Sequence, residues 1–259
     1  MAQFLGLLRH EFRMSVRRKS IWITFGVICI LLGFILSDTF DLEPGNIQTQ
    51  GDIWPATAEI VYMFNMWLAL IAGILAADRM QRDERFKMRE LQQSAPLGRV
   101  TYMLSKYCGV TLSLLLPAWI GVTLAGCVDI ALGLLPLAAL PALWVEFLAI
   151  SLPSIAFVTV FSLACPMVMP LRVYQILFTG YWFWGNYLNP EFFPTFSQTW
   201  LNASGLYPLQ AFFAAGFIET GREMFTVLEA VANYATLALC VGIAFLVLNQ
   251  VLKAKLNRA

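Results

Sequence analysis

The sequence predicts an all-α integral membrane protein with six transmembrane helices. Hydrophobic residues make up 59% of its 259 residues and charged residues only 13%, against about 45–50% and about 25% in soluble domains. The mean hydropathy is +0.69. In the long uncharged segments, apolar residues fill consecutive positions, which argues against the alternating pattern of a transmembrane β-strand.

Six apolar segments have about the length, roughly 17–25 residues, that a helix needs to cross the hydrocarbon core. They are Ile21–Ser37, Ile60–Ala77, Tyr107–Val128, Leu143–Met167, Val173–Leu188 and Ala230–Leu252, and the fourth differs from the others because it contains one charged residue, Glu146. The turn before the fourth span is expected near Pro136 and Pro141. Segment 37–57 carries acidic residues but no Lys or Arg, so we expect it to form an outer loop.

The distribution of basic residues predicts the orientation. With the N-terminus in the cytoplasm, all of the 17 Lys and Arg residues except Arg222 fall on the cytoplasmic side of the six spans. An excess of Lys and Arg is typical of cytoplasmic loops. The sequence therefore predicts a multi-pass protein with both termini in the cytoplasm.

Residues 1–20 are expected to form an amphipathic helix at the cytoplasmic interface, before a transmembrane domain that covers residues 21–259. Apolar residues recur at helical spacing on one face, and basic residues occupy another. The apolar residues are Phe4, Leu5, Leu8, Phe12 and Val16, and the basic ones are Arg9, Arg13 and Arg17. This pattern favours a helix that lies flat on the membrane. A cytoplasmic extension of the first span is the alternative.

A large outer loop, residues 189–229, is expected between the fifth and sixth spans. Its apolar segment Leu206–Ile218 is too short to cross the membrane, and a full span there would place the basic C-terminus outside. We expect a short re-entrant helix that dips into the outer leaflet and caps the outer side. An ordinary long loop is the alternative.

Motifs for catalysis and metal binding are missing from the sequence. His10 is the only histidine, and the five cysteines form no CxxC pair, so we expect no metal site and no cofactor. No GxxxxGK[ST] phosphate loop occurs. These features disfavour an intramembrane enzyme, and ATP would have to be bound by another protein. Nucleic acid is not an expected partner.

Glu146 is the outstanding acidic residue of the apolar segments. A carboxylate in the middle of a transmembrane helix is costly unless it faces a cavity or a partner, which makes Glu146 a candidate for the cargo path. If the fourth span begins near Leu143, however, Glu146 lies one turn into the helix at the outer interface, where the cost is small.

The segment 78–106, between the second and third spans, concentrates charge, with 11 charged residues among 29. Its first part consists mostly of good helix formers, and the pairs Asp78/Arg82 and Asp83/Lys87 place an acid four residues before a base, which supports a helix. Pro96 and Gly98 then force a break. We expect a charged cytoplasmic helix, a sharp turn, and a second helix that enters the third span; a simple solvated loop is the alternative.

Within this segment, the sequence contains Glu84-Arg85, Arg89-Glu90-Leu91, Ala95-Pro96-Leu97-Gly98-Arg99, and Tyr102 followed by Lys106. This pattern resembles the first cytoplasmic loop of ABC-2-type transporter permeases, although Lys87-Met88 replaces the small residues or Thr that are usual there. The six spans and the flat N-terminal helix extend the resemblance over nearly the whole chain.

The resemblance implies the permease half of an ATP-driven transporter, an exporter in the bacterial cytoplasmic (inner) membrane. It would pair with a second permease, identical or homologous, and with two separate ABC ATPase subunits. The segment 78–106 would contain the coupling helix, and its expected contacts with the ATPase are Asp83, Glu84, Arg85, Phe86, Met88, Arg89, Glu90, Leu91 and Pro96. The alternative is a membrane anchor or sensor that does not transport and that binds a cytoplasmic partner through the same segment.

Overall fold

The computed structural model describes residues 2–39, 50–85, 98–216 and 224–256, and helices are the only regular elements in these ranges. The helices are α1 (Ala2–Val16), α2 (Lys19–Thr39), α3 (Gln50–Ala76), α4 (Arg79–Arg85), α6 (Arg99–Ala131), α7 (Ala139–Glu146), α8 (Leu152–Ala164), α9 (Leu171–Asn186), α10 (Leu206–Phe213) and α11 (Val227–Leu256). A π-helical turn, η1 (Phe147–Ser151), joins α7 to α8, and a 3₁₀ turn, η2 (Cys165–Met167), follows α8.

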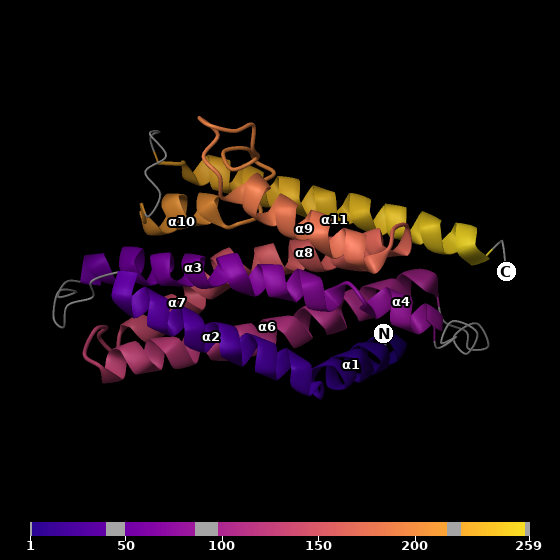
Figure 1. Ribbon diagram of the computed structural model, residues 1–259, viewed down its shortest axis with the longest axis horizontal. Coiled ribbons are helices and arrows are strands. Elements are labelled where there is room, and N and C mark those ends of the chain that lie inside the picture. Colours follow the sequence, from indigo (N-terminus) through magenta and orange to yellow (C-terminus); the bar gives the residue numbers. More distant parts are fainter. Residues whose placement is uncertain (1, 40–49, 86–97, 217–223, 257–259) are drawn as a thin grey trace.

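The long helices run along one axis and form an elongated bundle (Figure 1). Helix α3 packs against α2, α6, α7, α8 and α9 and so occupies the centre of the bundle. The N-terminus, the C-terminus and α4 lie toward the same end, while α10 lies toward the other end. This arrangement agrees with two termini on one side of a membrane.

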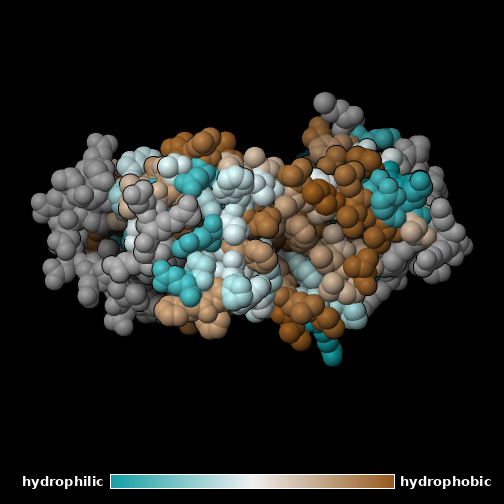
Figure 2. Space-filling view, turned by 90° about the horizontal axis from the view of Figure 1, so that it is seen from above, coloured by the Kyte–Doolittle hydropathy of each residue, from teal (hydrophilic) through white to brown (hydrophobic). Residues whose placement is uncertain are grey.

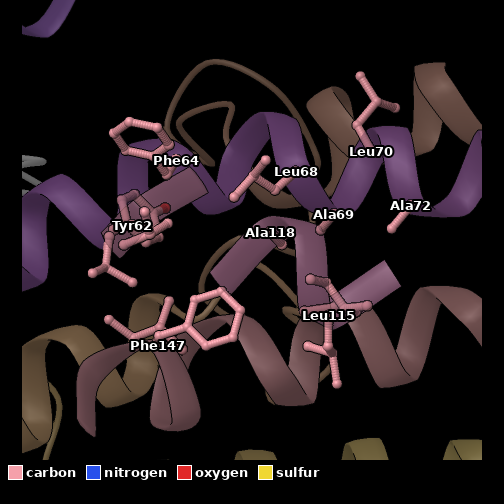
Figure 3. Close-up of a cluster of buried hydrophobic side chains, with 14 of the residues drawn as sticks. Tyr62, Phe64, Leu68, Ala69, Leu70, Ala72, Leu115, Ala118 and Phe147 are labelled. Carbon is pink, nitrogen blue, oxygen red and sulfur yellow. The ribbon is translucent and has the colours of Figure 1, made fainter. Parts of the chain in front are cut away.

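The core forms where α3 meets its neighbours. Figure 3 shows Leu68 and Ala69 of α3 facing Ala118 and Leu115 of α6, with Phe147 of η1 beside them. Leu68, Ala69 and Ala118 are completely buried. Because lipid tails are as apolar as these side chains, close packing by small residues such as Ala contributes strongly to the association of transmembrane helices.

Four helical segments are long and apolar enough to cross a membrane: Ile53–Asp83, Arg99–Ala131, Ala139–Met167 and Val227–Ala254. They contain the predicted second, third, fourth and sixth spans. Helix α2, with 21 residues, and helix α9, with 16 residues, coincide with the predicted first and fifth spans. These two helices remain predicted spans.

The surface of the bundle is apolar where lipid is expected. Figure 2 shows a broad hydrophobic area between hydrophilic residues toward the two ends. Helices α9 and α11 present large exposed side chains, among them Ile176 at 73%, Leu239 at 65% and Leu246 at 68% of their full accessibility. Apolar surface of this extent indicates an environment of lipid or of another protein.

Several element boundaries differ from the sequence-based expectation. A turn at Arg17 and Arg18 separates α1 from α2, which excludes a continuous extension of the first span. The outer loop 37–57 is shorter than expected because α3 already begins at Gln50. In the described part of the apolar segment 206–218, α10 ends at Phe213 and residues 214–216 are not helical.

The fourth membrane segment also begins earlier than expected. A turn with Gly133 at φ +77° follows α6, and α7 starts at Ala139, four residues before the expected start. Glu146 is therefore about two turns inside the helix instead of one. This shift changes the surroundings of Glu146, as described below.

Candidate functional site

The root of the charged segment lies against the N-terminal helix. Helix α4 leaves α3 after a turn at Ala77 and Asp78, and α6 begins at Arg99 directly after Gly98, whose extended backbone starts the helix. The predicted break at Pro96 and Gly98 is thus followed by a helix, as expected. Helix α1 crosses the first turns of α6 (Figure 1).

Lys106 is the centre of this site. Its side chain is only 1% exposed, and its Nζ atom lies 3.2 Å from Oε1 of Glu11 in α1 and 2.5 Å from Oδ2 of Asp83 in α4. The hydroxyl of Tyr102 also donates a hydrogen bond to Asp83. Tyr102 and Lys106 reach the same carboxylate because residues four apart lie on one face of a helix. One buried ammonium group therefore joins three elements.

The close contact of α1 with α6 depends on Gly109. A Cβ atom at this position would lie 2.7 Å from Cβ of Glu11 and 3.2 Å from the carbonyl oxygen of Leu8. The buried positions of α1 are Glu11 and Ser15, whereas Leu5 is 57% exposed. The face of α1 that packs on the protein is therefore centred on an acidic residue, which Lys106 neutralises. The predicted apolar residues Phe4, Leu8, Phe12 and Val16 are half-buried, and Leu5 is exposed.

A second group of charges surrounds Asp78, in the turn before α4. Arg82 lies 2.5 Å from the Asp78 carboxylate, and Arg18, from the turn between α1 and α2, lies 4.0 Å from it. Burial, and secondarily the charge of Arg82, lowers the pKa of Arg18. Asp78 thus holds the start of α4 next to the start of α2.

Arg79 is the least satisfied residue of this cluster. Its side chain is 2% exposed, and its Nε and Nη1 atoms have no hydrogen-bond partner in the part of the chain that the structure describes. The Oε2 atom of Glu11 is in the same condition. In an apolar interior, buried polar atoms without partners cost about 1–3 kcal/mol each.

Helix α4 also contacts the far side of the bundle. The Gln81 side-chain amide donates to the carbonyl oxygen of Pro166 in η2 at 2.6 Å. Met80 is buried in a cluster with Met167 of η2 and Leu248 and Leu252 of α11. A seven-residue helix is therefore attached to α6, to the end of α8 and to α11.

Glu146 lies at the opposite half of the molecule and is fully buried, with 0% exposure. The hydroxyl of Thr57 in α3 donates a hydrogen bond to its Oε1 atom at 2.7 Å. Its Oε2 atom has no hydrogen-bond partner among the described residues. Helix α3 thus covers the carboxyl group, which the early start of α7 places two turns inside its helix. A role of Glu146 in a cargo path stays a prediction.

A family comparison agrees with this architecture. Residues 7–185 match the model of a family described as "ABC-2 family transporter protein". The chain belongs to the ABC-2 transporter family. A comparison with curated proteins finds no significant match. The protein is thus a membrane permease of the ABC transporter class, a transmembrane component that is not itself catalytic.

The structure of this ABC-2 permease places only part of the predicted contact set. Asp83 lies in the cluster, with its carboxylate turned toward Lys106 and Tyr102. Glu84 and Arg85 end α4, but their side chains lie outside the described residues. So do Phe86, Met88, Arg89, Glu90, Leu91 and Pro96. Their contacts with an ATPase stay a prediction.

Sequence reasoning missed Glu11 and the buried polar residues of the half of the bundle that is opposite α4. The only signal for Glu11 in the sequence is that it is an acidic residue among the basic residues of the N-terminal helix. In the half opposite α4, the Asn65 amide donates to Ser154 Oγ at 2.9 Å and to the Ser204 carbonyl at 2.7 Å. Asn202 and Asn233 extend this network to α11. Asn65 is unremarkable in sequence because it lies singly in an apolar segment, and Asn202 because it lies among other small polar residues of a loop.

Proposed function

We propose that this permease is one half of an ATP-driven exporter and that it receives energy through the segment 78–106. Two separate ABC ATPase subunits would bind this segment on the cytoplasmic side, and a second permease, identical or homologous, would complete the transporter. Helices α2 and α9 would be the remaining spans, and α10 a re-entrant helix on the outer side. The membrane would be the bacterial cytoplasmic membrane.

The observation that carries this proposal is the bridge that Lys106 makes between Glu11 and Asp83. A displacement of the segment by a closing ATPase must reach the membrane helices in order to drive transport. Ionic and hydrogen-bonded contacts at 1% exposure resist separation, because parting them would leave buried charges unpaired. Helix α4, α1 and the start of α6 would therefore move together as a rigid body.

The further contacts of α4 support the same mechanism. Through Gln81 and Met80, α4 touches η2 and α11 as well as α6. A push on α4 would thus act on helices from both the N-terminal and the C-terminal half of the chain. A helix that acts as a lever must be attached to the elements that it moves. Helix α4 makes these attachments through Met80, Gln81 and Asp83, although it has only seven residues.

The topology supports the cytoplasmic position of the lever. All Lys and Arg residues except Arg222 fall on the side of the segment 78–106 when the six spans are counted. The two termini and α4 lie toward one end of the bundle (Figure 1). The positive-inside rule assigns that end to the cytoplasm.

The test is a charge reversal in the segment, Glu84→Lys combined with Glu90→Lys. Like charges in an interface cost several kcal/mol, so we expect the doubly changed permease to lose its ATPase partner during co-purification while it still inserts into the membrane. Glu191→Lys, at an exposed position on the opposite end, is the control and should behave as wild type.

Normal co-purification and normal transport by the doubly changed permease would refute the coupling role. Recovery of a cytoplasmic partner that does not hydrolyse ATP would instead favour the anchor or sensor function.

A further inference from the structure

A groove lies between α2, α3 and α6, in the part of the bundle that faces lipid. It has a volume of about 470 Å³. Helix α2 lines it from Trp22 to Gly33, and α6 lines it from Pro117 to Leu132, while Ile60 and Phe64 of α3 form its floor. The groove therefore follows α6 for about 22 Å, at 1.5 Å per residue.

Two glycines keep the groove open on the α2 side. A Cβ atom at Gly26 or at Gly33 would meet no other atom within 4 Å. These residues are seven apart, so they lie on one face of the helix, two turns from each other. By contrast, Gly121 of α6 is filled by the side chain of Cys29. Side chains larger than hydrogen at 26 and 33 would occupy the free space.

Among the described residues that line the groove, Asp129 is the only charged one. It lies near the C-terminal end of α6, away from the basic start of that helix. In the part of the chain that the structure describes, its carboxylate makes no ion pair and no hydrogen bond. Acidic residues in membrane segments are costly, and they commonly mark binding sites or pathways.

We propose that this groove binds a single-chain amphiphile with a cationic head group. The hydrocarbon chain would lie along α2 and α6, and the head group would reach Asp129. The apolar lining suits the chain, and the single unpaired carboxylate suits a cation. A volume of about 470 Å³ lies within the roughly 300–1,000 Å³ of pockets for small ligands.

A second copy of the permease fits the groove less well. The outer side of that second copy would have to bring a Lys or Arg side chain to Asp129. However, Arg222 is the only Lys or Arg that the charge distribution places on the outer side. A helix with its side chains is also about 10 Å wide, whereas α2 and α6 already touch through Cys29 and Gly121. The amphiphile is therefore the occupant that we infer.

The test uses the full chain in detergent or nanodiscs and two photoreactive probes with the same chain, one derived from dodecyltrimethylammonium and one from dodecanol. Mass spectrometry locates the labelled peptides. Asp129→Asn removes the charge at nearly constant size, and Gly26→Leu, or independently Gly33→Leu, fills the groove. Gly180→Leu is the matched control, because Gly180 of α9 also faces open space but lies outside the groove. Gel filtration selects variants that keep the wild-type profile.

We expect saturable labelling by the ammonium probe in residues 22–33 and 117–132. Asp129→Asn should weaken that binding about tenfold or more and leave the dodecanol probe unchanged. Gly26→Leu should weaken both probes, and Gly180→Leu neither.

Equal affinity of the wild type for both probes would overturn the recognition of a cation. If Gly26→Leu and Gly180→Leu change the labelling equally, the probes partition unspecifically into the lipid-facing surface and do not bind in the groove. If two copies of the permease cross-link through the groove and the probe no longer binds there, the occupant of the groove is a second permease and not an amphiphile.

Discussion

At the scale of single residues, Lys106 has the most consequential surroundings in the described part of the molecule. A buried ion pair is weak evidence for stability by itself, since desolvation offsets most of the attraction. The removal of one partner is a different matter, because it leaves the other charges buried and unpaired. Lys106 has two such partners, Glu11 and Asp83, so removal of Lys106 leaves two buried carboxylates unpaired.

We expect Lys106→Met to destabilise the permease by about 3–5 kcal/mol, the cost of breaking a buried pair, measured as a lower midpoint of thermal denaturation in detergent. Adding Asp83→Asn and Glu11→Gln should restore part of the loss, since it removes the uncompensated charges. Lys253→Met, which changes an exposed lysine of α11, is the control. A triple variant as unstable as the single one would show that the charges are not what holds the cluster together.

At the scale of elements, the segment between α9 and α10 is held by side-chain amides instead of regular structure. Asn202 donates to the Ser197 carbonyl at 2.5 Å, and its Oδ1 atom accepts from the Ser204 amide at 2.7 Å. Asn186 at the end of α9 accepts from the Ala203 amide at 2.7 Å. Backbone without helical hydrogen bonds is tolerated at membrane depth only when it is buried in protein in this way.

Replacing Asn202 by Ala should loosen this segment without unfolding the bundle. The buried backbone groups of Ser197 and Ser204 would lose their partners, at about 1–3 kcal/mol each. Hydrogen exchange of the amides at 203–206 should accelerate at least about tenfold. Asn189→Ala is the matched control, because the Asn189 side chain binds only the exposed amide of Glu191. Unchanged exchange in Asn202→Ala would mean that hydrophobic packing of α10 suffices.

Element boundaries were predictable where charge, Pro or Gly determines them. The basic residues up to Lys19 anticipate the start of α2, and Pro96 with Gly98 anticipates the start of α6 at Arg99. The bases after Leu252 do not end a helix, because α11 continues to Leu256. The surroundings of Glu146 were not predictable, because the turn after α6 depends on Gly133 and because Thr57 lies 89 positions away in sequence. The pairing of Lys106 with Glu11 was hidden for the same reason, since no periodicity connects residues 95 positions apart.

At the scale of the whole molecule, charge and apolar surface define one axis. Basic residues gather toward the end with the two termini, and exposed apolar residues such as Ile176 and Leu246 cover the flanks. The segment between α9 and α10 lies toward the half of the bundle opposite the two termini (Figure 1). The orientation of this axis in the cell is open to a direct measurement.

We expect that a membrane-impermeant maleimide will label Glu191→Cys in intact cells and will label Lys253→Cys only after the membrane is broken. Both positions are exposed, and the background should lack the five native cysteines. The physical reason is the preference of Lys and Arg for the cytoplasmic side. The reverse pattern, or labelling of both positions in intact cells, would contradict two cytoplasmic termini.

The length of α6 sets how far the proposed coupling segment stands from the lipid. With 33 residues, the helix is about 50 Å long, whereas the hydrocarbon core is about 30 Å thick. About 20 Å of straight helix must therefore lie outside the core, and the first turns, where α1 crosses at Gly109, are the charged part. A docked partner would press on the permease clear of the lipid head groups, and the stiffness of α6, which carries Pro117 in its interior, would decide how much of that displacement reaches the membrane.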